Sequence, residues 1–280
     1  MQQISLMALK LLSRHLAQKH PQQFKEIVET LLSIIKAHEN VSRVVLATVV
    51  LCLAEICSNL RAQSISYLHV FMPSLILILE KQLETFNTPD NVLFSTITAV
   101  HKIVETLPLF LSPYLVDLIV CLSQIWSKIK LQSIPETMQV LFSNRLNAIW
   151  KKLATILSLR VLIPTINMSF DTLIAAERYG GIGPLMKLFG QSFENVSNSD
   201  IAPFIADLTT FFVGALQFRC NHPEMDVNTI SAVETQIIEA FVALVFKLSE
   251  GSFRPIYNKI YDWALRDETE SPDRAITFFR

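Results

Sequence analysis

The residues that could do chemistry in this 280-residue chain are few and widely separated. A metal site needs three or four side chains that converge in space. The four cysteines show no CxxC spacing, and the six histidines show no HExxH or HxH spacing. No GxSxG or SxxK sequence supplies an activated nucleophile. We therefore expect no catalytic residue, no metal, no cofactor and no small-molecule substrate, and we expect the cysteines to be reduced core thiols.

The one glycine cluster is Gly180-Gly181-Ile182-Gly183. It lacks the GxGxxG and GxxxxGK[ST] spacings that cradle phosphates, and no strand is predicted before it. We expect a loop between two helices.

A basic segment lies between Trp126 and Arg160. It holds six Lys and Arg residues against Glu136 alone, a net charge of +5: Lys128, Lys130, Arg145, Lys151, Lys152 and Arg160. Such residues could contact RNA phosphates or an acidic partner, and the alternative is an ordinary solvated helix face. Trp150 is the aromatic directly before Lys151 and Lys152, and its spacing places it in the core. A base-stacking platform is therefore not indicated.

The most distinctive local sequence is Phe253-Arg254-Pro255 followed by Asp262-Trp263. Arg and Trp are typical of the residues that dominate binding energy at protein interfaces. The alternative is structural: Arg254 pairs with a nearby carboxylate at a helix entry, and Trp263 fills a gap between repeats.

A proline-marked repeat organises the elements that carry these residues. Six amphipathic segments begin near a proline, at intervals of 52, 40, 51, 39 and 52 residues: Pro21, Pro73, Pro113, Pro164, Pro203 and Pro255. The mean interval, about 47 residues, is typical of HEAT or armadillo repeats. Proline is tolerated in the first turn of a helix. Each segment is therefore predicted to be the second helix of a helical pair that starts at its proline.

The first helices of the pairs are predicted from apolar residues that recur with helical spacing. They span Arg43–Asn59, Val92–Thr106, Val140–Leu157, Pro184–Asn195 and Thr229–Glu250. A lone pair cannot cover its own apolar stripe, so the pairs must stack. The sequence predicts an all-α solenoid of stacked helical hairpins.

Composition bounds the function further. The chain is 51% hydrophobic with a net charge of −1, which removes the strongest argument for a stand-alone nucleic-acid binder. Its apolar runs are short or interrupted by polar residues, so we expect no transmembrane helix. Both ends present uncapped apolar residues, which predicts a piece of a longer repeat protein.

Five stretches, in order along the chain, resemble the family of the very large HEAT-repeat protein of the small-subunit processome. They are QQISLMALKLL (2–12), VETLPLFLSPYL (104–115), LRVLIPTI (159–166), FFVGALQFR (211–219) and KLSEGSFRPIYNKIYDWAL (247–265). The resemblance implies HEAT-like repeats over residues 1–158, and a C-terminal domain of that family, truncated at its end, over residues 159–280.

The resemblance also implies a function. It implies a nucleolar, non-enzymatic scaffold for pre-ribosomal RNA processing and ribosomal DNA transcription. The expected partners are processome proteins and a small nucleolar ribonucleoprotein, with contact to pre-ribosomal RNA as a further option and no membrane. The alternative is a HEAT-repeat adaptor of another class, such as a nuclear transport receptor or a phosphatase scaffold.

Overall fold

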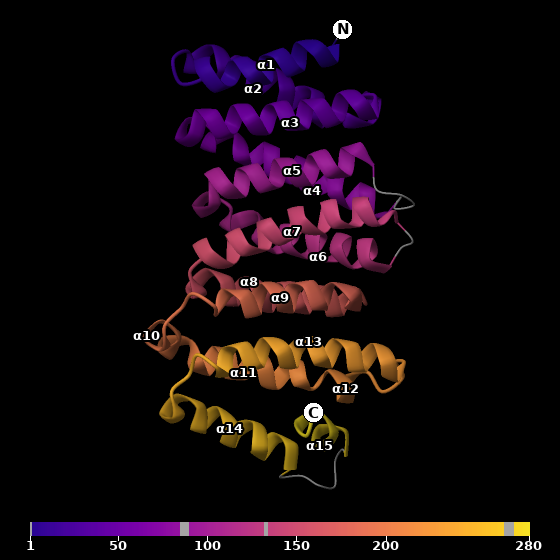
Figure 1. Cartoon of the computed structure of the whole chain (residues 1–280), viewed down its shortest axis with the longest axis vertical. Helices are drawn as coiled ribbons and strands as arrows, with labels where there is room; N and C mark the ends of the chain where they lie inside the picture. Colours follow the sequence, from indigo (N-terminus) through magenta and orange to yellow (C-terminus); the bar gives the residue numbers. More distant parts are fainter. Residues whose placement is uncertain (1, 85–89, 132–133, 266–271) are drawn as a thin grey trace. The chain divides into compact units, whose positions relative to one another are not determined.

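The computed structural model describes residues 2–84, 90–131, 134–265 and 272–280. Within these ranges the chain forms α-helices and short 3₁₀ turns, and no β-strand (Figure 1). The helices belong to two compact units, Met1–Ile156 and Leu157–Arg280. The predicted all-α fold is confirmed.

The first unit is built from two layers of helices. One, the A layer, contains α1 (Gln2–Leu16), α3 (Arg43–Leu60), α5 (Asn91–Thr106) and α7 (Glu136–Ile156). The other, the B layer, contains α2 (Pro21–Lys36), α4 (Leu68–Glu84) and α6 (Leu115–Leu131). Each A helix contacts the next A helix, and α2, α4 and α6 follow one another in the same way (Figure 1). This is the stacked-hairpin arrangement of an α-solenoid.

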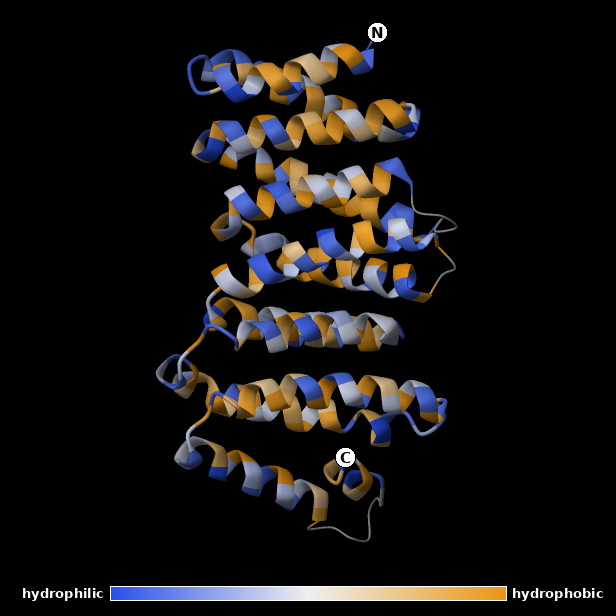
Figure 2. Cartoon of the chain, viewed as in Figure 1, coloured by the Kyte–Doolittle hydropathy of each residue, from blue (hydrophilic) through white to orange (hydrophobic). Residues whose placement is uncertain are grey.

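The core of this unit lies between the two layers. Helix α3 is buried along most of its length because it contacts α1, α2 and α5. Trp126 on α6 and Trp150 on α7 meet edge to face, with ring centroids 5.7 Å apart and both side chains buried. The prediction that Trp150 is a core residue is confirmed. Figure 2 shows apolar and polar residues mixed along each helix, as expected where one face packs and another is hydrated.

The second unit repeats the plan with shorter elements. Its longer helices are α8 (Leu159–Ala175), α9 (Ile182–Ser192), α11 (Ile205–Leu216), α13 (Val227–Val245) and α14 (Glu250–Leu265). Three short helices accompany them: α10 (Asn198–Ile201), α12 (Phe218–Asn221) and α15 (Pro272–Phe278). Helices α8, α11 and α14 contact in succession, and α9 packs against α13. Phe189, Phe211 and Phe212 contact one another in the core, with ring centroids 5.2–5.6 Å apart.

The predicted helix starts are corrected at three prolines. Pro21 begins α2, and Pro113 and Pro203 lie in 3₁₀ turns directly before α6 and α11. Pro73, Pro164 and Pro255, however, lie inside α4, α8 and α14, which begin about one turn earlier than predicted.

The position of these three prolines explains why the helices tolerate them. Each proline removes the hydrogen bond to the carbonyl four residues before it. Those carbonyls belong to His69, Arg160 and Gly251, which are exposed, as are the prolines themselves. Water can therefore satisfy the freed carbonyls, and the helix continues.

The glycine cluster also differs from the expected loop. Tyr179–Gly181 forms a 3₁₀ turn, and α9 begins at Ile182, so Gly183 belongs to the first turn of a helix. Because α9 ends at Ser192, the predicted first helix Pro184–Asn195 lies slightly too far along the chain.

Within the part of the chain that the structure describes, three helical segments are long and apolar enough to cross a membrane by length and composition alone: Arg43–Glu84, Asn198–Leu216 and Val227–Val245. The apolar stretches are therefore longer than the sequence analysis assumed, and the expectation that the chain has no transmembrane helix stays a prediction. Stacking between neighbours accounts for the apolar character of the first segment, in which α3 buries its apolar side chains against α1, α2 and α5.

Candidate functional site

A buried carboxylate joins three consecutive helices of the A layer. Glu55 on α3 is 4% exposed and accepts hydrogen bonds from Arg14 on α1, at 3.0 Å, and from Lys102 on α5. Burial raises the pKa of the Glu55 carboxyl, but the hydrogen bonds from Lys102 and Arg14 more than offset it, so the pKa lies below its ordinary value. The single carboxylate of Glu55 therefore forms ion pairs with two cations, both of which are partly exposed to solvent.

The next contact along the layer joins α5 to α7. Arg145 Nη1 lies 3.1 Å from His101 Nδ1, and the same guanidinium lies over the Phe94 ring, 5.9 Å from its centroid. Burial lowers the pKa of His101, and the positive charges of Arg145 and Lys152 lower it further, against the opposite effect of Glu105. A neutral imidazole can accept the hydrogen bond from Arg145.

The predicted basic segment is divided by the fold. Arg145, Lys151 and Lys152 lie on α7 in the A layer, with Lys151 exposed. Lys128 and Lys130 lie on α6 in the B layer. There, Lys128 Nζ donates to the Leu83 carbonyl at 2.5 Å, and Lys130 lies 5.9 Å from the centre of the Trp126 ring.

Arg160, the last residue of that segment, begins the second unit. It is exposed in the first turn of α8. The structure therefore places Arg145 and Lys152 near His101 on α5, and it does not bring the six predicted residues into one cluster.

Sequence reasoning missed a second buried carboxylate, Glu234 on α13. Arg219 donates to both of its oxygens, at 2.8 and 2.6 Å, Arg280 donates at 2.7 Å, and the Thr277 hydroxyl donates at 3.0 Å. Burial raises the pKa of Glu234, and these hydrogen bonds bring it below its ordinary value. The only sequence signal was a carboxylate inside an apolar helix. The hydrogen bonds of Glu234 indicate a structural role, because they join α13 to Arg219, Thr277 and Arg280.

The Phe253–Trp263 motif lies on α14. Arg254, Pro255 and Asp262 are exposed, whereas Phe253 and Trp263 are half-buried. Phe253 begins a line of ring contacts that continues through Tyr257. The Trp263 ring has the Arg274 guanidinium 6.0 Å from its centroid. The motif thus combines exposed charges with rings that pack partly inside the unit.

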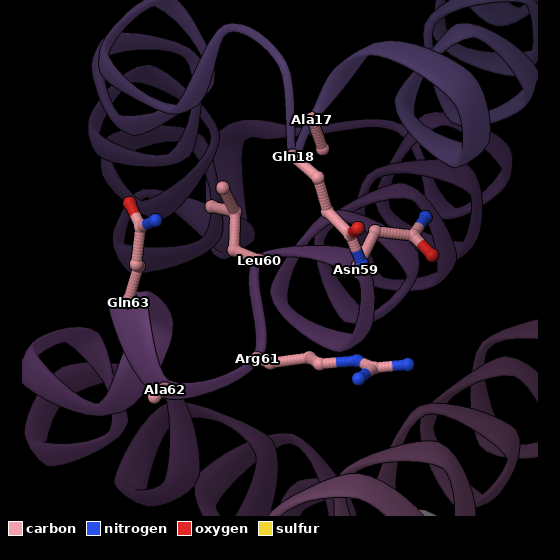
Figure 3. A pocket seen from close by; sticks show the side chains of 7 residues that line it. All are labelled: Ala17, Gln18, Asn59, Leu60, Arg61, Ala62 and Gln63. Atoms are coloured by element: carbon pink, nitrogen blue, oxygen red, sulfur yellow. The ribbon is translucent and has the colours of Figure 1, made fainter.

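A shallow pocket of about 360 Å³ lies where α1 and α3 end. Its lining is Ala17, Gln18, Asn59, Leu60, Arg61, Ala62 and Gln63. Figure 3 shows Arg61 and Gln63 extending in different directions from its rim. The lining offers one cation and three amides, and it contains no carboxylate, imidazole or thiol for acid–base or nucleophilic chemistry.

Among the described residues, no group of three or more His, Cys, Asp or Glu side chains is placed to hold a metal ion. Cys52, Cys57 and Cys121 are buried, and Cys220 is half-buried. Burial raises the pKa of Cys52 to about 11 and that of Cys57 to about 12. The thiols of Cys52 and Cys57 are therefore held protonated, unlike those of catalytic cysteines.

Helical pairs that stack in succession define a HEAT-type α-solenoid protein. The family described as the BP28CT (NUC211) domain matches residues 200–280. HEAT repeat-containing protein 1 from Homo sapiens is 35% identical over 279 residues, covering 99% of this chain. Its homolog from Drosophila melanogaster is 33% identical over 290 residues, covering the whole chain. The chain belongs to the HEAT repeat-containing protein 1 family.

A more distant relative carries a different name. U3 small nucleolar RNA-associated protein 10 from Schizosaccharomyces pombe is 30% identical over 99 residues, which is 34% of this chain and 6% of that protein. The chain spans only 13–14% of the length of the human and Drosophila relatives. It therefore corresponds to a small part of such proteins.

Proposed function

We propose that this chain is part of a non-catalytic HEAT-repeat scaffold in ribosome biogenesis, acting in the small-subunit processome around the U3 small nucleolar ribonucleoprotein. Membership in the HEAT repeat-containing protein 1 family carries the proposal. The relatives named for association with U3 small nucleolar RNA support its setting. In this proposal the chain acts in the nucleolus, in pre-ribosomal RNA processing and ribosomal DNA transcription, and its partners are processome proteins.

The mechanism in this proposal is geometric. Stacked hairpins present long faces, and ion pairs such as Glu55 with Lys102 and Arg14 hold successive A helices in register. A face held in this way can bind proteins or ribonucleoprotein segments at fixed spacings. No bond is made or broken.

The proposal assigns separate parts to residues 1–158 and 159–280. The first would be the repeat array, and the second would be the family's C-terminal domain. The two compact units and the match of the BP28CT domain within residues 200–280 support this assignment.

Co-sedimentation tests the proposed function. The protein that contains this chain is tagged, and nuclear extract is separated on a sucrose gradient and probed for the tag and for U3 small nucleolar RNA. We expect both in the same large particle. Sedimentation with transport cargo or with a phosphatase, away from U3 RNA, would support the alternative class of HEAT adaptor and overturn the proposal.

A further inference from the structure

The two layers of the first unit differ in charge. The A helices carry seven Lys and Arg residues against three Glu residues, a net of +4. The B helices carry five cations and five anions, a net of zero. The whole chain has a net charge of −1, so composition alone conceals this difference.

Most of the A-layer cations form what we call the basic strip, which comprises Lys10, Arg14, Lys102, Arg145, Lys151 and Lys152. The seventh cation, Arg43, is engaged elsewhere, because it binds Asp90 and Gln82. The strip extends along the layer because α1, α3, α5 and α7 contact one another in succession (Figure 1).

The strip keeps a positive excess after its internal ion pairs are formed. Glu55 serves both Arg14 and Lys102, so one of those two charges is not neutralised. Arg145 is bonded to an imidazole, which brings no negative charge. Glu105 is a second carboxylate of the A layer and lies close to His101. Six cations against Glu55 and Glu105 therefore leave four positive charges in excess along the strip.

The surroundings of the strip are polar on α5 and on the later part of α7, whereas α1, which carries Lys10 and Arg14, also exposes apolar side chains such as Leu11 and Leu12. No large apolar side chain is exposed on α5 or on residues 142–156 of α7, all of which the structure describes. A protein interface of useful affinity is usually built around buried aromatic or aliphatic anchors. A polyanion needs no such anchor, because charge attraction and counterion release supply most of its binding energy.

We propose that the basic strip binds the phosphodiester backbone of RNA. This inference rests on the proposed function, which places the chain next to RNA. Trp150 is fully buried, so the strip has no exposed ring there on which bases could stack. Binding is therefore expected to follow charge and to show little preference for sequence.

The test uses the purified 280-residue chain and a fluorescently labelled 30-nucleotide single-stranded RNA, with affinity measured at several salt concentrations. The variant K151E/K152E reverses two cations of the strip. The matched control, K36E/K130E, makes the same charge change on exposed lysines of the B helices α2 and α6. Circular dichroism verifies that both variants keep their helices.

We expect K151E/K152E to weaken RNA binding at least tenfold. It should also make the slope of log K against log salt shallower by about 1.4, because each phosphate contact with a single strand contributes about 0.7. The control should remain within about twofold of the wild type. Equal losses in both variants, or no binding by the wild type at 50 mM salt, would overturn the inference.

Three further outcomes distinguish RNA from a protein partner and separate the inference from the proposed function. Stronger binding of an acidic peptide than of RNA would assign the strip to a protein partner and overturn the inference. Failure to bind RNA, with sedimentation alongside U3 RNA unchanged, would overturn the inference and leave the proposed function in place. RNA binding by the strip without such sedimentation would support the inference and overturn the function.

Discussion

Arg219 donates a hydrogen bond to each carboxylate oxygen of Glu234, with Nε 2.8 Å from Oε1 and Nη2 2.6 Å from Oε2. The two residues come from successive helices, α12 and α13, and Glu234 is fully buried. Thr277 and Arg280 bind the same carboxylate from the end of the chain. The Glu234 side chain therefore connects three segments of the second unit.

Glu234→Gln should lower the free energy of unfolding by about 3–5 kcal/mol, because neutralising one partner leaves the half-buried guanidinium of Arg219 uncompensated. Urea unfolding followed by circular dichroism measures this. The control is Glu239→Gln, an exposed site on the same helix, which should change stability by less than about 0.5 kcal/mol. Equal effects of the two substitutions would show that the Glu234 tie contributes little.

Acid should destabilise the fold through both buried carboxylates. The pKa values of Glu55 and Glu234 are lowered in the folded state, since hydrogen bonds outweigh burial. The resulting stabilisation is fully present above the unfolded pKa, about 4.3, and is lost as the pH falls through the folded pKa. Melting temperatures recorded from pH 3 to pH 7 should fall steeply at the acid end. The double variant E55Q/E234Q should show a flatter profile, and a parallel profile would refute this explanation.

Glu177→Gly should stabilise the second unit by about 1 kcal/mol. Glu177 follows the end of α8 with φ of 55°, a backbone conformation that costs an L-residue roughly 1–2 kcal/mol and glycine almost nothing. The following amide of Arg178 donates to the Leu173 carbonyl at 2.9 Å, as at a helix end that favours glycine. Thermal unfolding measures the gain. A similar gain from Glu177→Ala would mean that the side chain, not the backbone, is responsible.

Thiol reactivity should distinguish one cysteine from the other three. Burial holds the pKa of Cys52 near 11 and that of Cys57 near 12, and Cys121 is buried as well. Ellman's reagent at pH 7.5 should therefore react within minutes with Cys220 alone, and with all four thiols in denaturant. The variant Cys220→Ser should lose the fast phase. A second fast thiol would show that the core opens readily.

The repeating elements could be predicted from the sequence because they depend on local rules. Apolar spacing located α3 and α5 within one residue of their observed bounds. Proline marked the second helices, but it misplaced the start of three of them. A helix tolerates proline in its second turn when the freed carbonyl faces water, as at Pro73, and the sequence alone does not reveal that orientation.

Contacts between repeats could not be predicted in the same way. The partners of Glu55 are 41 and 47 residues away along the chain, beyond the reach of local spacing rules. Lys130 and Lys151 belong to one basic segment in the sequence, but they lie in different layers because α6 and α7 form the two sides of the stack. Counting charges over consecutive residues therefore predicts the charge of a surface less well than counting them over the helices of one layer.

The measurement that tests the scaffold proposal most directly is a pull-down of the tagged chain from nucleolar extract, with and without ribonuclease. The proposal predicts that processome proteins are recovered together with U3 small nucleolar RNA, and that the proteins remain after ribonuclease treatment. Recovery of transport receptors' cargo or of a phosphatase, without processome proteins under either condition, would contradict it.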